Sequence, residues 1–346
     1  MKETIIKSYK AFDSSLSCKS FQYEVGKEYE TKVHIECGIR GFHACESPLE
    51  VFDSYDMLTS RFAEVEQSGY IDRDEDTTKV CSSCIRINAE LKLADIINIG
   101  IEWLKDITSL SQAKTGTFLS DNGEKRKQIG SSVDSARIGS SDDFAQIGSI
   151  GDYAWIGSSG PYANIGSSGN YTLIGSSGYS AKIGSSGDYA QIGSSSNYAQ
   201  IGSSGDYAKI GSSGKSVKIG SSGDSVEIGS SGNCAQIGSL GNFAQIGSSG
   251  DLAKIGSFGD FAQISSSGKF AKIDSTGSDS VIMCAGCKAM AKAKIGSWIT
   301  LSEWVYSEGK GRYVPVCVKT EYVDGENIKA DTYYQLIDGV FTEVNE

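Results

Sequence analysis

Residues 183–210 read Ile-Gly-Ser-Ser-Gly-Asp-Tyr-Ala-Gln, Ile-Gly-Ser-Ser-Ser-Asn-Tyr-Ala-Gln, Ile-Gly-Ser-Ser-Gly-Asp-Tyr-Ala-Lys, Ile, which are three copies of the nine-residue unit that decides the fold. Isoleucine recurs at this spacing from Ile129 to Ile282, eighteen times without a break. An α-helix would not tolerate two glycines in every nine residues over such a length, because each costs roughly 1 kcal/mol. We therefore expect extended strands interrupted by turns.

Alternation within each unit predicts one buried and one exposed face. Along Tyr-Ala-Gln-Ile-Gly-Ser, the Ala, the Ile and one Ser share one face, and the Tyr, the Gln or Lys, and the Gly share the other. The inner positions are nearly uniform, whereas the Gln position also accepts Arg137, Trp155 and Leu173. The Ser-Gly-Asp that follows has the composition of a turn, in which we expect glycine to supply the positive φ.

One nine-residue unit cannot bury its own apolar face, so the units must stack. Two units per coil, about 18 residues, give the smallest closed arrangement, in which two parallel sheets enclose an Ile/Ala/Ser core. Alternate units should then differ, and they do. In one set the Asp position holds Asp134, Asp152, Asn170, Asp188, Asp206, Asp224, Asn242 and Asp260, whereas the other set mixes Asp with Pro161, Tyr179 and Lys215. The predicted fold is a mainly β protein built on a nonapeptide-repeat β-solenoid.

Two other repeat architectures share the period of nine. Calcium-binding nonapeptide rolls place Asp two residues before the apolar position, where this chain has Ala, so we do not expect calcium in the turns. An intertwined trimeric fibre, in which each of three chains supplies one face, stays open as an alternative.

Ordinary sequence flanks the repeat on both sides. We expect an N-terminal α+β capping module over 1–120, the solenoid over 121–294 and a C-terminal β capping domain over 295–346. In the first segment, Ser47-Pro48-Leu49-Glu50 predicts the start of a helix that runs to about Ser60. Strands are expected over 61–71 and 79–90, and a second helix over 91–110. In the last segment, strands are expected over 314–322 and 332–344, with a turn at Ile337-Asp338-Gly339.

Two motifs of the N-terminal module carry a resemblance. Phe21-Gln22-Tyr23-Glu24-Val25-Gly26 and Gly41-Phe42-His43-Ala44-Cys45 are similar to a module found in uncharacterised proteins of bacteriophages and gut Firmicutes. Those proteins join the module, of unknown function, to tandem short β-solenoid repeats and a small C-terminal β domain. The resemblance implies a phage or prophage origin, and it transfers no catalytic residue.

The charge balance limits the classes of partner. The 346 residues include 32 basic and 43 acidic ones, a formal charge of −11. Direct, sequence-independent binding to nucleic acid is not expected, because it needs lysine and arginine to replace the counterions of phosphate. No stretch approaches the roughly 18 apolar residues of a membrane span. The start also lacks the apolar run of a secretory signal, so we expect a cytoplasmic or virion-associated protein.

The N-terminal module contains the residues from which a metal site could be built. Cys81 and Cys84 form a Cys-x-x-Cys pair that could bind zinc together with Cys37, Cys45 or His43, since thiolate and imidazole are preferred zinc ligands. The simpler interpretation is that these cysteines pack in a core. His43 with Cys37 or Cys45 could form a catalytic Cys-His pair, but the spacing of these residues does not require one. We expect no enzyme and no cofactor, with zinc as the alternative.

The outer face of one set of units supplies the candidate binding surface. Its aromatic positions recur once per coil beside the acidic column, and together they give a predicted binding face of Tyr153, Tyr171, Tyr189, Tyr207, Phe243, Phe261, Asp152, Asp188, Asp206 and Asp224. Such a ladder could bind a protein, a glycan or a second copy of the chain. The leading hypothesis is a non-enzymatic scaffold or binding protein. The alternatives are an acidic DNA mimic that inhibits a host nucleic-acid enzyme, and the trimeric virion fibre.

Overall fold

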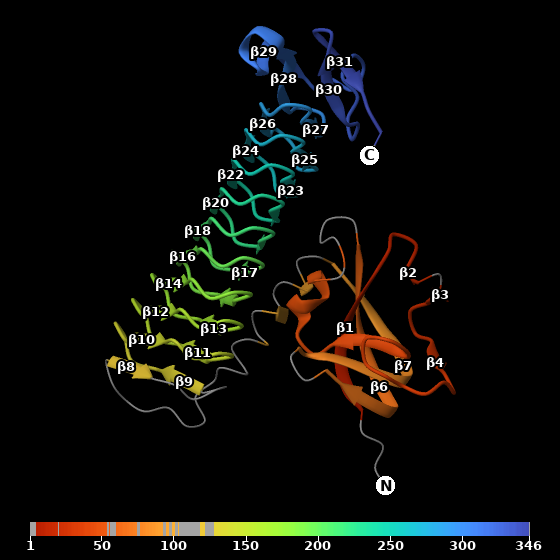
Figure 1. Cartoon of the computed structure of the whole chain (residues 1–346), viewed down its shortest axis with the longest axis vertical. Coiled ribbons are helices and arrows are strands. Elements are labelled where there is room, and N and C mark those ends of the chain that lie inside the picture. The colour runs from red at the N-terminus through yellow and green to blue at the C-terminus, as the bar shows by residue number, and fades with distance from the viewer. Residues whose placement is uncertain are drawn as a thin grey trace. The chain divides into compact units, whose positions relative to one another are not determined.

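The computed structural model describes residues 5–19, 21–53, 55, 60–74, 77–92, 95–96, 99–100, 103, 118–121 and 128–345. The chain divides into two compact units, Met1–Trp103 and Leu104–Glu346, shown in Figure 1. Within the described ranges, no helix has the length and apolar character that crossing a membrane requires.

The N-terminal unit is built around a small antiparallel sheet with the strand order β4-β7-β5-β1-β6. Strand β6 also pairs with β7, so four of the strands close on themselves around a core that includes Phe12, Val65 and Ile87. The elements are β1 (Ile6–Phe12), β2 (Ser17–Cys18), β3 (Phe21–Gln22), β4 (Glu28–Glu30), β5 (Phe42–Cys45), the 3-10 helix η1 (Pro48–Asp53), β6 (Arg61–Arg73) and β7 (Lys79–Leu91).

The second unit contains two parallel sheets whose strands alternate along the chain, and Figure 1 shows them stacked coil upon coil. The first sheet contains β8 (Phe118–Asp121), β10 (Arg137–Ser140), β12 (Trp155–Ser158), β14 (Leu173–Ser176), β16 (Gln191–Ser194), β18 (Lys209–Ser212), β20 (Glu227–Ser230), β22 (Gln245–Ser248), β24 (Gln263–Ser266) and β26 (Val281–Cys284). The second contains β9 (Gln128–Ser131), β11 (Gln146–Ser149), β13 (Asn164–Ser167), β15 (Lys182–Ser185), β17 (Gln200–Ser203), β19 (Lys218–Ser221), β21 (Gln236–Ser239), β23 (Lys254–Ser257), β25 (Lys272–Ser275) and β27 (Met290–Lys292).

The register confirms the predicted coil of about 18 residues. Ile192 of β16 lies opposite Ile174 of β14 on one side and Ile210 of β18 on the other. Every unit therefore places its isoleucine over the isoleucine two units earlier. One chain closes each coil by itself, so three intertwined chains are not needed to bury this core.

Burial confirms the predicted inner face. Ala190, Ile192 and Ser194 are buried on one side of strand β16, whereas Gln191 and Gly193 are exposed on the other. The inward serines do not form a ladder of hydroxyl hydrogen bonds. The hydroxyls of Ser203 and Ser221, like most in these rows, have no hydrogen-bond partner among the described atoms. A coil spacing of about 4.8 Å is too long for an O–H···O bond of about 2.8 Å.

The turns correct one expectation about glycine. The residue with positive φ is the aromatic one, as in Tyr189 at 57° and Tyr207 at 56°, and the turn glycine two residues before it has no positive φ. Glycine is required there for space. A Cβ built on Gly205 would lie 2.0 Å from the carbonyl oxygen of Gly187 in the preceding coil. The left-handed conformation of the aromatic turn residues costs roughly 1 kcal/mol or more for each L-residue that adopts it.

We expect the exchange Ser225→Gly to stabilise the solenoid by about 1 kcal/mol, because Ser225 has a φ of 55° that glycine adopts without strain. The matched control is Ser231→Gly at an exposed serine outside the set with positive φ, where glycine should destabilise by about 0.5–1 kcal/mol. Urea unfolding of both variants measures the difference. Equal effects of the same sign would contradict the assignment of strain to the aromatic position.

The C-terminal residues extend both solenoid sheets. Strand β28 (Trp298–Ser307) pairs in parallel with β26, and β29 (Arg312–Tyr322) returns antiparallel to β28, with the 3-10 helix η2 (Glu308–Lys310) between them. In the other sheet, β30 (Tyr334–Ile337) pairs antiparallel with β27 and forms a hairpin with β31 (Val340–Glu343). The predicted turn Ile337-Asp338-Gly339 joins these two strands, with positive φ at Asp338 and Gly339.

Of the remaining local predictions, some are confirmed and others are not. Strands β6 and β7 occupy the predicted ranges, and β29 confirms the strand over 314–322. The helix expected from Ser47 is only the short η1, and the residues that would continue it include 54 and 56–59, which lie outside the described residues. The strand expected over 332–344 is two strands with a turn. The helix expected over 91–110 falls mostly outside the described residues, although 95–96, 99–100 and 103 are helical.

Candidate functional site

The predicted aromatic positions form stacked ladders along one turn edge of the solenoid. The ring centroids of Tyr153, Tyr171, Tyr189 and Tyr207 are 4.9–5.1 Å apart in succession, with interplanar angles of 4–7°. After an interruption at Ser225, Phe243 and Phe261 stack at 5.1 Å. All six rings are exposed by 42–55%. The repeat of the coil thus sets the spacing of the rings, because each holds the same place in the turn.

The stacking decides which part of each tyrosine a partner can touch. Inserting another flat group between two rings needs about 7 Å, twice the contact distance of carbon atoms. Rings about 5 Å apart leave no such space, so they cover one another's faces and present their edges and hydroxyls. Desolvation and the neighbouring phenols raise the pKa of Tyr189. Tyr189 therefore presents a protonated hydroxyl donor at neutral pH.

The predicted acidic column forms a second ladder, which bonds to the backbone. In each coil, Oδ1 of the Asp or Asn accepts a hydrogen bond of 2.7–3.0 Å from the backbone N–H of the residue eighteen positions later. The acceptors are Asp134, Asp152, Asn170, Asp188, Asp206, Asp224, Asn242 and Asp260. The column thus satisfies one backbone donor per turn, which explains why Asp and Asn exchange freely there.

The DNA-mimic hypothesis stays a prediction, and this bonding gives the acidic column a structural role that the hypothesis did not anticipate. Asparagine keeps the Oδ1 acceptor and removes the charge. Replacing Asp152, Asp188, Asp206 and Asp224 with Asn therefore tests the hypothesis without breaking the ladder.

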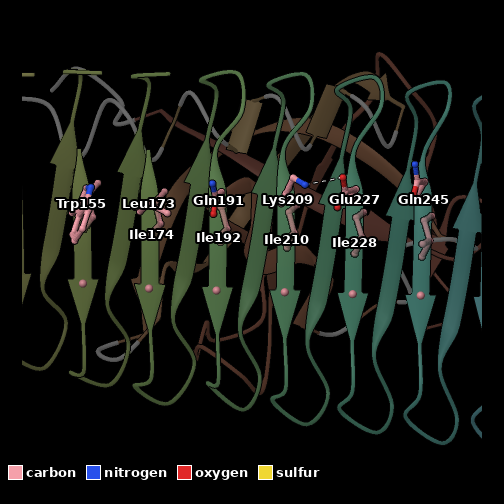
Figure 2. A pocket seen from close by; sticks show the side chains of 18 of the residues that line it. Trp155, Leu173, Ile174, Gln191, Ile192, Lys209, Ile210, Glu227, Ile228 and Gln245 are labelled. Carbon is pink, nitrogen blue, oxygen red and sulfur yellow. Dashed lines mark ion pairs between the residues drawn. The ribbon is translucent and has the colours of Figure 1, made fainter. Parts of the chain in front are cut away.

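A groove that sequence reasoning missed follows the outer face of the first sheet. It is lined by the variable position and the strand glycine of successive strands, from Arg137 and Gly139 at one end to Val281 and Met283 at the other. Figure 2 shows Trp155, Leu173, Gln191, Lys209, Glu227 and Gln245 side by side on this face. The missing side chains of the glycines hollow the surface. The signal was present in the sequence, as glycine on an outward position of most strands.

The groove is chemically varied along its length. The guanidinium carbon of Arg137 lies 5.0 Å from the centre of the Trp155 ring, and Lys209 Nζ lies 2.9 Å from Glu227 Oε1. The turns that carry the tyrosine ladder lead directly into these strands, since Tyr189 precedes Gln191 by two residues. Ladder and groove therefore run along the same series of strands.

The candidate zinc ligands are dispersed in the N-terminal unit. Cys81 and Cys84 lie on the extended strand β7, where residues three apart point to opposite faces, so the pair cannot close around one ion. His43 lies opposite Cys81 in the register, Cys45 lies opposite Lys79, and Cys37 Sγ is 3.8 Å from the Lys79 carbonyl oxygen. Among the described residues, no three Cys, His, Asp or Glu side chains gather closely enough to hold a metal ion. Metal analysis of the purified protein tests the zinc prediction.

The thiols of Cys37 and Cys81 are also poor nucleophiles. Burial raises the pKa of Cys37, and it raises the pKa of Cys81 to about 11. His43 Nε2 accepts a hydrogen bond of 2.9 Å from the backbone N–H of Gly38, and burial lowers the pKa of this imidazole. The histidine therefore holds the loop before β5, and its Nε2 is not free to activate Cys37 or Cys45.

Comparison with known proteins identifies one part of the chain. Residues 6–99, which correspond to the N-terminal unit, match a family described as a domain of unknown function (DUF7666). Neither the curated proteins nor the solved structures contain a match to the chain. The protein thus joins a DUF7666 domain to a β-solenoid scaffold.

Proposed function

We propose that the protein is a non-enzymatic binding scaffold of phage or prophage origin, and that it holds a partner protein against the tyrosine ladder. The observation that carries the proposal is the row of four half-exposed tyrosines at the spacing of the coil. Phenol edges combine an apolar ring with a hydrogen-bonding tip, which suits protein interfaces. A rigid solenoid holds such groups in fixed positions, so a partner does not have to order them on binding.

The stacked geometry favours a protein over a glycan. Sugars stack on the faces of aromatic rings, and here the tyrosines cover one another's faces. A flat protein surface, or the ladder of a second copy, can instead contact ring edges and accept hydrogen bonds from the hydroxyls. The predicted residues of the acidic column lie beside this row and add one carboxylate or amide per coil.

The test is the triple variant Tyr171→Ser, Tyr189→Ser and Tyr207→Ser, since serine already occupies this turn position at residue 225. We expect loss of partner binding with unchanged β-type circular dichroism, because the buried Ile/Ala core is not altered. The matched control is Tyr162→Ser, Tyr198→Ser and Phe270→Ser in the other series of turns, where the rings are similarly exposed. Binding is measured by affinity capture from host extract, counting proteins that the control retains and the ladder variant loses.

The possible outcomes distinguish between kinds of partner. Light scattering that shows an oligomer of the wild type and a monomer of the ladder variant identifies a second copy as the partner. Retardation by a polysaccharide gel that the ladder variant loses identifies a glycan and overturns the protein proposal. Capture that both variants retain equally removes the ladder as the binding surface.

A further inference from the structure

The N-terminal unit contains a pocket of about 460 Å³. None of the residues that line it takes part in the proposed scaffold function. Its walls include the rings of Phe21, Tyr23 and Phe42, and its polar groups include Lys10, Cys18 and Tyr55. The residues come from β1, from β5 and from the β2–β3 hairpin and its surroundings. A partly enclosed aromatic pocket with a few convergent polar groups is the usual form of a small-molecule site.

Lys10 is unusual because it lies inside the unit, with only 6% of its surface exposed. Its Nζ donates a hydrogen bond of 2.7 Å to the backbone oxygen of His43. It also lies 5.6 Å and 5.7 Å from the ring centres of Phe12 and Tyr23. A buried lysine held in this way costs stability that a neutral residue would not, so its retention calls for a chemical reason.

The third contact of Lys10 is the thiol of Cys18. Lys10 Nζ lies 3.7 Å from Cys18 Sγ, and Tyr55 Oη donates to the same sulfur at 2.8 Å. Two donors thus converge on one sulfur in the pocket wall, and Cys18 is partly exposed there. The thiolate is the reactive form of cysteine, and neighbouring cations and donors stabilise it.

The electrostatics of the three groups agree with this geometry. Burial lowers the pKa of Lys10 and so brings it closer to the usual pKa of a thiol. The neighbouring Cys18 acts in the opposite direction and raises the pKa of Lys10. Burial and the hydrogen bond to Cys18 raise the pKa of Tyr55, so this phenol stays protonated and donates. The titratable groups around them also include Tyr23, His43, Cys45, Lys19 and Glu50.

We propose that this pocket captures small carbonyl compounds, aldehydes above all, by reversible addition of the Cys18 thiol, with Lys10 moving the proton and Tyr55 donating to the carbonyl oxygen. Lys10 takes the proton of the thiol, and Sγ forms a bond to the carbonyl carbon. The π electrons of the C=O bond pass to the oxygen, which then receives the proton back from Lys10. The product is a thiohemiacetal, and the step has no leaving group and needs no oxidant.

The pocket also indicates the body of the ligand. Aromatic walls favour a flat apolar group. Lys19 and Lys79 contribute positive charge to the lining, which favours an anionic substituent. A planar aldehyde that carries a carboxylate, such as 4-carboxybenzaldehyde, combines the three features and is the probe we would use.

The first experiment measures the alkylation rate of Cys18 by iodoacetamide in the full chain, with peptide mass spectrometry. Cys234, a partly exposed thiol in a solenoid turn, is the internal reference. Because Lys10 and Tyr55 both donate toward Cys18 Sγ, we expect Cys18 to react about tenfold faster at pH 7. Equal rates for the two thiols would overturn the activation of Cys18.

Variants separate activation from folding. Tyr55→Phe removes only the hydroxyl, and Lys10→Met keeps a long apolar chain in the buried position. We expect each to reduce the Cys18 rate several-fold while the Cys234 rate stays unchanged. If Lys10→Met fails to fold, Tyr55→Phe decides. Rates that Tyr55→Phe leaves unchanged would contradict the role of the two donors.

The second experiment tests the carbonyl class. We expect 4-carboxybenzaldehyde at millimolar concentration to protect Cys18, but not Cys234, from iodoacetamide, and the protection to reverse on dilution. Benzaldehyde, which lacks the carboxylate, should protect at higher concentration only. A fast Cys18 that neither aldehyde protects would overturn the carbonyl ligand. None of these outcomes depends on the tyrosine ladder.

Discussion

Replacing Gly205 with alanine should destabilise the solenoid by about 3 kcal/mol, although the change adds a single methyl group. The new Cβ would lie 2.0 Å from the carbonyl oxygen of Gly187 and 2.5 Å from its carbonyl carbon. These are backbone atoms of the coil below, so they cannot rotate away as a side chain could. Relief requires the two coils to separate at that turn, which lengthens the neighbouring hydrogen bonds between strands.

The matched control for this prediction is Gly211→Ala. Gly211 is also a repeat glycine, but it lies on the outer face of strand β18 and a Cβ there meets nothing within 4 Å. We expect its effect to stay within about 0.5 kcal/mol, as for most surface substitutions. Urea unfolding followed by circular dichroism, with hydrogen exchange to locate any opened coils, compares the two variants. A similar loss in both would show that the close approach of the coils is not what selects glycine at position 205.

The second large effect is expected for Ile210→Ala, which should cost about 3–4 kcal/mol. Ile210 is 2% exposed and stacks between Ile192 and Ile228 in adjacent strands. Truncation leaves a cavity in a column of identical side chains, and the sheets cannot collapse into it without disturbing the register above and below.

The neighbouring residue supplies the control for the core prediction. Lys209→Ala removes an exposed ion pair with Glu227, in which both side chains are at least half exposed. Such pairs contribute about 0–1 kcal/mol. Thermal and urea unfolding of the two variants should therefore differ by more than 2 kcal/mol. A loss at Lys209 as large as that at Ile210 would mean that the outer row stabilises the sheet as much as the core does.

These two predictions explain how one repeat can be both uniform and varied. The isoleucine and the turn glycine are constrained by contacts between successive coils. In the first sheet the outward positions are mostly exposed, so Arg137, Trp155 and Gln191 can share one row without disturbing the coil. Any function that the outer surface performs can therefore change independently of the fold.

The sequence predicted the solenoid well because its evidence is periodic. The spacing of Ile129 to Ile282, the alternation around each isoleucine and the divergence of alternate units all agreed on eighteen residues per coil, and pairs such as Ile174 with Ile192 confirm it. It predicted the short N-terminal elements less well. The helix expected at Ser47 rested on a local capping pattern, and the structure has only the 3-10 helix Pro48–Asp53 there.

The candidate sites were also predicted well only where they follow the repeat. The tyrosine and acidic columns were visible because residues eighteen apart in sequence become neighbours in a periodic fold. The ligand set around Cys81 and Cys84 was not supported, since an extended strand turns their side chains apart. Lys10, Cys18 and Tyr55 were not selected as a group, because no spacing relates a residue of β1 to one that follows η1.

The sequence by itself determined the period, the two-sheet coil, the buried isoleucine column and the residues on the turn edge, because each of these follows from the repeated unit and from the difference between alternate units. Only the tertiary structure decided the contacts between coils and between distant segments. It placed the positive φ on the tyrosines, bonded the aspartates to the backbone of the next coil and brought Lys10 to Cys18 and Tyr55. The physical reason is that such contacts depend on distances in space, which a periodic sequence specifies along the solenoid and an irregular one does not.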